Sequence, residues 1–136
     1  MKKYQLMAPG PTPVPADVLL AMARPMIHHR TPEYETLFIE VRAGLKKLFQ
    51  TQAEVLPLAC SGTGAMEAAV VSTLSAGDTV AVVRAGKFGD RWVEICKAYG
   101  LTVIELGADF GRSVPAERVA DTLAANPRVK AVLAQH

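Results

Sequence analysis

Two glycine-containing segments of the chain combine residue types that could bind a ligand. The first is the segment 60–64, where a short apolar run changes into a helical pattern at Ser61-Gly62-Thr63-Gly64. The first amides of a helix lack intrahelical acceptors and the helix dipole is positive there, so such a junction attracts anions. Gly62 and Gly64 would let the backbone approach a phosphate, and Ser61 and Thr63 would add hydroxyl donors. The spacing matches neither a Walker A loop nor G-x-G-x-x-G, and a capped structural turn without a ligand explains it equally well.

The second segment is Gly86-Lys87-Phe88-Gly89, which closes the next predicted strand. An aromatic side chain at the carboxyl end of a strand lies where open α/β sheets bind ligands, and Phe88 could stack on a heteroaromatic ring. The alternative is that Phe88 and Trp92, four residues apart, both pack the helix against the sheet; Trp92 is assigned to packing. Together the two segments supply a phosphate cradle and a stacking ring, the parts needed to hold a phosphorylated aromatic cofactor.

Strands and helices alternate in the region that positions these segments. Short apolar runs predict buried strands at 55–60, 79–83, 102–106 and 129–133, and helical patterns lie between them at 64–74, 89–99 and 115–125. This alternation predicts an α/β fold, a mostly parallel sheet with flanking helices. Pro57 lacks an amide donor, which moves the first of these strands toward an edge or toward its own start.

The N-terminal region reads differently. Prolines at alternate positions from 9 to 15 exclude a helix and predict an extended arm. A short helix from Pro15 to near Pro25 follows, and apolar residues at three- and four-residue steps predict an amphipathic helix over 33–50. We therefore expect three parts: an arm at 1–14, a helical region at 15–50, and an incomplete α/β cofactor-binding domain at 51–136. No element follows the last strand to cover its neighbours, so we expect the chain to be truncated or to continue further.

Composition and charge narrow the class of protein. Fifteen Lys and Arg against thirteen Asp and Glu give a net charge of +2, and the basic residues are scattered, which does not favour nucleic acid. The apolar runs are far shorter than the roughly 20 residues of a membrane span. Prolines replace the apolar region of a signal peptide, so we expect a cytoplasmic protein.

The cysteines and histidines suggest no metal site. Cys60 and Cys96 lie in different predicted elements without metal-ligand spacing, which favours reduced, structural thiols. Cys60 precedes the first segment, but no base has a sequence reason to lie beside it. The pair His28-His29 has no third ligand at metal spacing, and no metal is predicted.

Four segments in order resemble one known family. Ala8-Pro9-Gly10-Pro11-Thr12-Pro13-Val14-Pro15, His29-Arg30-Thr31-Pro32-Glu33-Tyr34, Ser61-Gly62-Thr63-Gly64-Ala65-Met66-Glu67-Ala68 and Gly86-Lys87-Phe88-Gly89-Asp90-Arg91 resemble class V pyridoxal-phosphate-dependent aminotransferases of the alanine/serine–glyoxylate or serine–pyruvate group. The resemblance covers essentially the whole chain. It implies the N-terminal part of the large domain of a fold-type I enzyme whose cofactor is pyridoxal 5'-phosphate.

The resemblance also implies roles for particular residues. Ser61, Gly62 and Thr63 match the family's phosphate-binding turn, and Phe88 matches its ring-stacking aromatic residue. Ala8, Pro9 and Gly10 match the segment near the substrate carboxylate. His29 and Arg30 match a segment beside the dimer interface and the mouth of the active site, where a solvated or structural role is as good an interpretation. His136 matches the residue before a further cofactor-contacting run, which is absent.

The family's homodimer would use the proline arm and the helix at 33–50. Its Schiff-base lysine and the carboxylate that faces the pyridine nitrogen have no match here, and Lys87 matches no catalytic lysine. We expect the 136 residues alone to be inactive. The full protein would transfer an amino group between a small amino acid, such as alanine or serine, and a 2-oxo acid, such as glyoxylate or pyruvate.

Three other interpretations stay open. A cysteine desulfurase would share the fold but would have a histidine in place of Phe88. A non-catalytic phosphate- or nucleotide-binding module of flavodoxin-like shape could use the Ser61 turn as its phosphate loop, but would not need the proline arm and the helices at 15–50. A structural segment without any ligand is the third.

Overall fold

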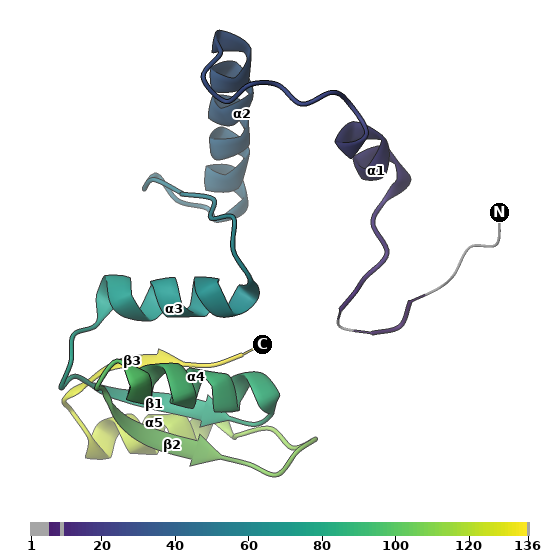
Figure 1. Ribbon diagram of the computed structural model, residues 1–136. Helices are drawn as coiled ribbons and strands as arrows, with labels where there is room; N and C mark the ends of the chain where they lie inside the picture. The colour runs from purple at the N-terminus through teal and green to yellow at the C-terminus, as the bar shows by residue number, and fades with distance from the viewer. Residues whose placement is uncertain (1–5, 9, 136) are drawn as a thin grey trace. The chain divides into compact units, whose positions relative to one another are not determined.

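The computed structural model describes residues 6–8 and 10–135, and the chain divides into two compact units, 1–57 and 58–136. The first unit holds α1 (Ala16–Met22) and α2 (Pro32–Leu48). The second holds α3 (Gly62–Thr73), β1 (Thr79–Arg84), α4 (Lys87–Ala98), β2 (Thr102–Gly107), α5 (Ala116–Ala125) and β3 (Val129–Leu133) (Figure 1). No helix in the described ranges is long and apolar enough to cross a lipid bilayer.

The first unit consists of helices with well-formed ends and uncovered apolar faces. Thr31 caps α2 by accepting a hydrogen bond from the amide of Tyr34 at 3.4 Å, and Pro32 occupies the first helical position, where its missing amide is harmless. The two helices bury none of their residues, and Leu37 and Val41 of the predicted amphipathic stripe are exposed. The prediction of both helices is confirmed, with α1 ending at Met22.

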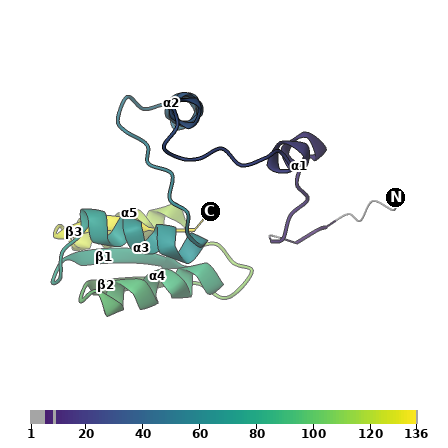
Figure 2. The same ribbon diagram turned by 45° about the horizontal axis from the view of Figure 1, so that its top comes forward.

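The second unit is built on a parallel sheet in the strand order β2-β1-β3. Thr79 of β1 pairs with Thr102 of β2 on one side and with Val129 of β3 on the other. Helices α3 and α4 cover one face of the sheet and α5 covers the other (Figures 1 and 2). The prediction of an α/β fold with a parallel sheet and flanking helices is confirmed.

The core lies between β1 and the two helices on the first face. Val80 and Val82 of β1 are fully buried, as is Cys96 of α4, and Val70 of α3 packs with them. Trp92 belongs to the same cluster, so its assignment to packing is confirmed. Burial of these side chains, at about 1.5–3 kcal/mol each, fixes both helices on the strand that precedes the Phe88 turn.

The predicted strand at 55–60 is absent, and this prediction was wrong. Residues 55–59 form no ladder, and Leu56 and Leu58 are 71% and 62% exposed. Pro57 has no amide to donate, and the amide of Cys60 bonds locally to the carbonyl of Leu58 at 3.1 Å. The apolar character of the run indicated burial, but the described residues provide no neighbouring strand to pair with it.

Two helices begin earlier than predicted. Helix α3 begins at Gly62 instead of Gly64, because Ser61 acts as its N-cap. Helix α4 begins at Lys87 instead of Gly89, because the amide of Asp90 already bonds to the carbonyl of Gly86 at 3.0 Å. Phe88 therefore lies inside the first turn of α4 and not in a loop before it.

Candidate functional site

The turn before α3 keeps free donors at its tip. Ser61 accepts a hydrogen bond from the amide of Gly64 at 3.2 Å through Oγ, and its carbonyl accepts from the amide of Ala65 at 3.1 Å. Within the described part of the chain, the amides of Gly62 and Thr63 have no acceptor. Ser61 is exposed, and its hydroxyl hydrogen is still available to a ligand. Two amides without an acceptor, the exposed Ser61 hydroxyl and the positive end of the helix therefore lie together at this turn, and such groups attract a phosphate.

A side chain at Gly64 would crowd Cys60, which precedes this turn. A β-carbon at Gly64 would lie 3.0 Å from Cys60 Cβ and 3.3 Å from Cys60 Sγ, so the cysteine side chain lies close against the first turn of α3. Cys60 is exposed and carries a free thiol, unlike the buried Cys96. Neither cysteine forms a disulfide, and the interpretation of both thiols as structural stays a prediction.

Phe88 projects from the first turn of α4 beside a hollow at the end of β1. Its side chain is 57% exposed, while Trp92 one turn later is buried. The hollow has a volume of about 160 Å³ and is lined by Val83, residues 85–89 and Gln135, which follows β3. Complete small-molecule pockets measure roughly 300–1,000 Å³, so these residues supply one wall of a site and not all of it.

The two segments face the same edge of the sheet. The first turns of α3 and α4 and the end of β3 all lie on the side of the strand arrowheads (Figure 1). The chain leaves β1 toward β2, whereas β3 lies on the opposite side of β1, so the hollow is at a topological switch point. Ligands of open α/β sheets bind at such points, outside the carboxyl ends of the strands.

Charged residues surround the turn that carries Phe88. Arg84, the last residue of β1, donates from Nε to Asp90 Oδ1 of α4 at 2.5 Å, and its Nη1 lies 3.4 Å from Glu105 Oε2 of β2. The Asp90 carboxylate raises the pKa of the Arg84 guanidinium above its ordinary value. Lys97, with Arg84 as a smaller cause, lowers the pKa of the Glu105 carboxyl. The Arg84 guanidinium and the Glu105 carboxylate therefore both favour their charged forms.

Comparisons with known proteins place the chain. No family model matches it. Over 81% of its length, the chain is 54% identical to a protein of Synechococcus named "Soluble hydrogenase, small subunit", and it covers 29% of that protein. Over 96% of its length, it is 40% identical to the serine–glyoxylate aminotransferase of Hyphomicrobium methylovorum, and it covers 33% of that protein. The structure of ureidoglycine–glyoxylate aminotransferase from Bacillus subtilis superposes over 98% of the chain with a TM-score of 0.87 and 26% identity, covering 35% of that chain.

The chain is homologous to class V aminotransferases. The resemblance seen in the sequence is thereby confirmed, as is the likeness of the fold to the large domain of these enzymes. The chain spans about a third of the length of the curated relatives it matches.

All the site roles that the family resemblance implies stay predictions, including those of the residues outside these two turns. Ala8 and Gly10 are exposed in the first unit, and Pro9 and His136 lie outside the described residues. His29 and Arg30 line a hollow at the start of α2, within the first unit. Among the described residues, no group of three His, Cys, Asp or Glu side chains could hold a metal ion.

The sequence analysis did not identify three residues at or beside the candidate site. Gln135 lines the hollow beside Phe88, but nothing in its local sequence indicates a role. Arg84 and Asp90 flank the second segment, six residues apart, and this spacing does not mark them as a charge pair. Their pairing becomes evident only when β1 and the start of α4 are placed side by side.

Proposed function

We propose that this chain supplies the phosphate cradle and the ring-stacking residue of a pyridoxal-phosphate-dependent aminotransferase. The reaction would transfer an amino group between a small amino acid, such as alanine or serine, and a 2-oxo acid, such as glyoxylate or pyruvate. The observation that carries the proposal is the placement of the Ser61 turn and of Phe88 at one edge of one sheet, in a homologue of class V aminotransferases.

The residues present fit the two ends of the cofactor. Ser61, Gly62 and Thr63 would hold the phosphate through two unpaired amides and two hydroxyls, and the α3 dipole adds to the attraction. Phe88 would cover one face of the pyridine ring, because its ring is exposed beside the hollow between β1 and β3. Pyridoxal phosphate, when bound, supplies an electron sink for reactions at the α-carbon of an amino acid.

The neighbouring residues would exclude water and set the approach. Burial of Trp92 and Val93 keeps the helix behind Phe88 closed to solvent. Ala8, Pro9 and Gly10 would contact the substrate carboxylate, as the family resemblance implies. We further propose that the full protein is a cytoplasmic homodimer. The exposed apolar residues of α2 and the free state of both cysteines support this.

Cofactor binding tests the first half of the proposal. Trp92 is the only tryptophan of these 136 residues and lies one helical turn after Phe88, so the part of the fluorescence that Trp92→Phe removes reports a chromophore bound there. Titration of the full-length protein with pyridoxal phosphate should quench this emission saturably, and pyridoxal without the phosphate should bind at least about tenfold more weakly. Ser61→Ala and Phe88→Ala should each weaken binding, by about 1–2 kcal/mol. Equal affinity for both compounds would contradict the phosphate cradle.

Product analysis tests the second half. Alanine or serine incubated with glyoxylate should yield glycine and the matching 2-oxo acid. Sulfide release from cysteine would instead indicate a desulfurase. Because one relative is named a hydrogenase, hydrogen uptake with an artificial electron acceptor is a necessary third assay. Hydrogen uptake without amino transfer would overturn the proposed function.

A further inference from the structure

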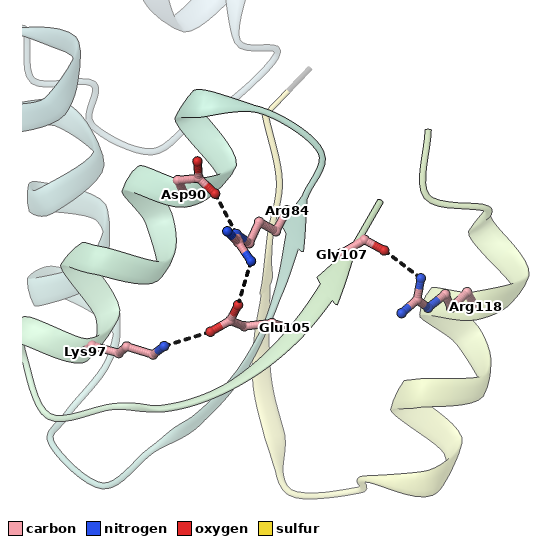
Figure 3. Close-up of polar contacts among 6 residues, drawn as sticks. All are labelled: Arg84, Asp90, Lys97, Glu105, Gly107 and Arg118. Atoms are coloured by element: carbon pink, nitrogen blue, oxygen red, sulfur yellow. Dashed lines mark hydrogen bonds and ion pairs between the residues drawn. The ribbon is translucent and has the colours of Figure 1, made fainter. Parts of the chain in front are cut away.

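The turn that carries Phe88 is bridged by a side-chain ion pair. Arg84 ends β1 and Asp90 lies in the first turn of α4, so their contact at 2.5 Å closes the segment 85–89 as a short loop. Figure 3 shows the Arg84 guanidinium between Asp90 on one side and Glu105 of β2 on the other. Arg84 thus joins the start of α4 to the two strands beneath it.

The contacts continue beyond Arg84 as a chain of alternating charge. Glu105 is 3.4 Å from Arg84 through Oε2 and accepts from Lys97 Nζ of α4 at 2.7 Å through Oε1. The chain of charges therefore begins at Asp90 in the first turn of α4, crosses β1 and β2, and returns to the last turn of α4 at Lys97. Carboxylates and cations alternate along it. Planar guanidinium groups suit this position, because separate N–H donors can serve two carboxylates at once.

The backbone beneath the pair is packed without spare room. A β-carbon at Gly89 would lie 2.9 Å from both Arg84 Cα and Val83 O, so the start of α4 rests directly on the end of β1. Close packing fixes the distance between helix and strand. It leaves the rotation of the first turn, and thereby the direction of the Phe88 ring, to be set by side chains.

We propose that Arg84 is a positioning residue that, through Asp90 and Glu105, holds the Phe88 ring over the hollow at the end of β1. This inference rests on the proposed function for its use in cofactor binding, but the immobilised turn is a property of the chain itself. Arg84 and Asp90 line a separate polar groove that shares no lining residue with the Phe88 hollow, so Arg84 would act through the turn without touching the cofactor.

The test uses Arg84→Gln, Asp90→Asn and the double variant in the full-length protein. Without cofactor, amide hydrogen exchange of residues 85–90 should be about fivefold faster in each single variant. With cofactor, the dissociation constant for pyridoxal phosphate should rise about fivefold and the circular dichroism band of the bound cofactor should weaken. The double variant should be no worse than Arg84→Gln alone, because Arg84→Gln already removes the contact with Asp90.

Lys130→Met is the matched control. It breaks an ion pair of similar exposure and length, Lys130 Nζ to Asp78 Oδ1 at 2.6 Å. This pair lies at the opposite end of the sheet, because Asp78 directly precedes β1 and Lys130 is the second residue of β3. It should leave exchange at 85–90 and cofactor affinity unchanged within about 1.5-fold. Arg84→Lys should recover part of the loss, since an ammonium can pair with Asp90 but cannot also reach Glu105 in the same way.

The outcomes separate this inference from the proposed function. If wild-type protein binds no pyridoxal phosphate, the proposed function fails while the exchange measurement still decides whether Arg84 immobilises the turn. Unchanged exchange at 85–90 in Arg84→Gln and Asp90→Asn would overturn the inference. Faster exchange with unchanged cofactor affinity would overturn it as well, because Arg84 would then immobilise the turn without positioning the Phe88 ring for the cofactor.

Discussion

Tyr99 at the end of α4 donates a hydrogen bond from its hydroxyl to a carboxylate oxygen of Glu67 in α3. The contact joins the two helices whose first turns carry Ser61 and Phe88. The bond to Glu67, together with burial and the nearby negative charge, raises the pKa of the Tyr99 phenol above its ordinary value. Phenolate formation would lose the donated proton and place two negative charges together.

We predict that Tyr99→Phe lowers the melting temperature near neutral pH by about 1–2 °C, as expected for one exposed polar contact. Because the folded-state pKa is raised, the contribution is fully present below the ordinary tyrosine pKa of about 10 and is lost as pH rises through the folded value. Thermal unfolding of wild-type and variant, followed by circular dichroism from pH 7 to 11, should show the two curves converging. Parallel curves over this whole range would mean that any difference in stability does not depend on the donated proton of Tyr99.

Gly89→Ala should be the most damaging of the single-methyl substitutions at glycines in the second unit. Its new β-carbon would lie 2.9 Å from the backbone of β1, and backbone atoms cannot move aside as a flexible side chain can. We expect a loss of about 1–3 kcal/mol in the free energy of unfolding, measured by urea denaturation. Gly107→Ala is the control, since its β-carbon would meet no atom within 4 Å. Equal losses in the two variants would show that the clash is not the cause.

Gly64 and Cys60 should show strong coupling. Gly64→Ala places a β-carbon 3.0 Å from Cys60 Cβ, which would push the start of α3 away from Cys60. We expect about tenfold weaker binding of pyridoxal phosphate, measured through Trp92 fluorescence. Adding Cys60→Gly removes both atoms that clash, so the double variant should bind more tightly than Gly64→Ala alone. Additive losses in the cycle would contradict a direct contact.

The sequence predicts this molecule well where local patterns coincide with packing. Alternation of short apolar runs with helical patterns was sufficient for β1, β2, β3 and the helices between them. The run at 55–60 shows the limit of such patterns, because Leu56 and Leu58 are apolar but exposed. A strand also needs a partner strand with free backbone donors and acceptors, and the sequence of the run does not show whether one is present. Apolar character indicates burial somewhere, and does not identify the surface that provides it.

The candidate site shows a similar division. Ser61 could have been identified as the N-cap of α3 from its residue type, and this would have moved the helix start to Gly62. For Phe88, the sequence left packing and stacking as equal alternatives. Its 57% exposure beside the buried Trp92 depends on how α4 is placed against β1. The contacts of Arg84, Asp90 and Gly89 lie between these two elements, and no local pattern reveals them.

The two thiols should differ sharply in reactivity. Cys96 is fully buried in the core between α4 and β1, and burial raises the pKa of its thiol, so its reactive thiolate is scarce and shielded. Cys60 is exposed beside Ser61, in the turn before α3. Alkylation of the folded protein at neutral pH, followed by mass spectrometry, should label Cys60 at least about a hundredfold faster than Cys96.

Cys60→Ser gives the matched control for this labelling, because the variant should take up label only when denatured. Pyridoxal phosphate should slow the labelling of Cys60, since a phosphate held by the amides of Gly62 and Thr63 would lie next to the thiol and repel the thiolate. Inorganic phosphate should do the same at higher concentration, whereas pyridoxal without phosphate should not. Protection of Cys60 by pyridoxal and pyridoxal phosphate alike would place the cofactor's ring, and not its phosphate, at the start of α3.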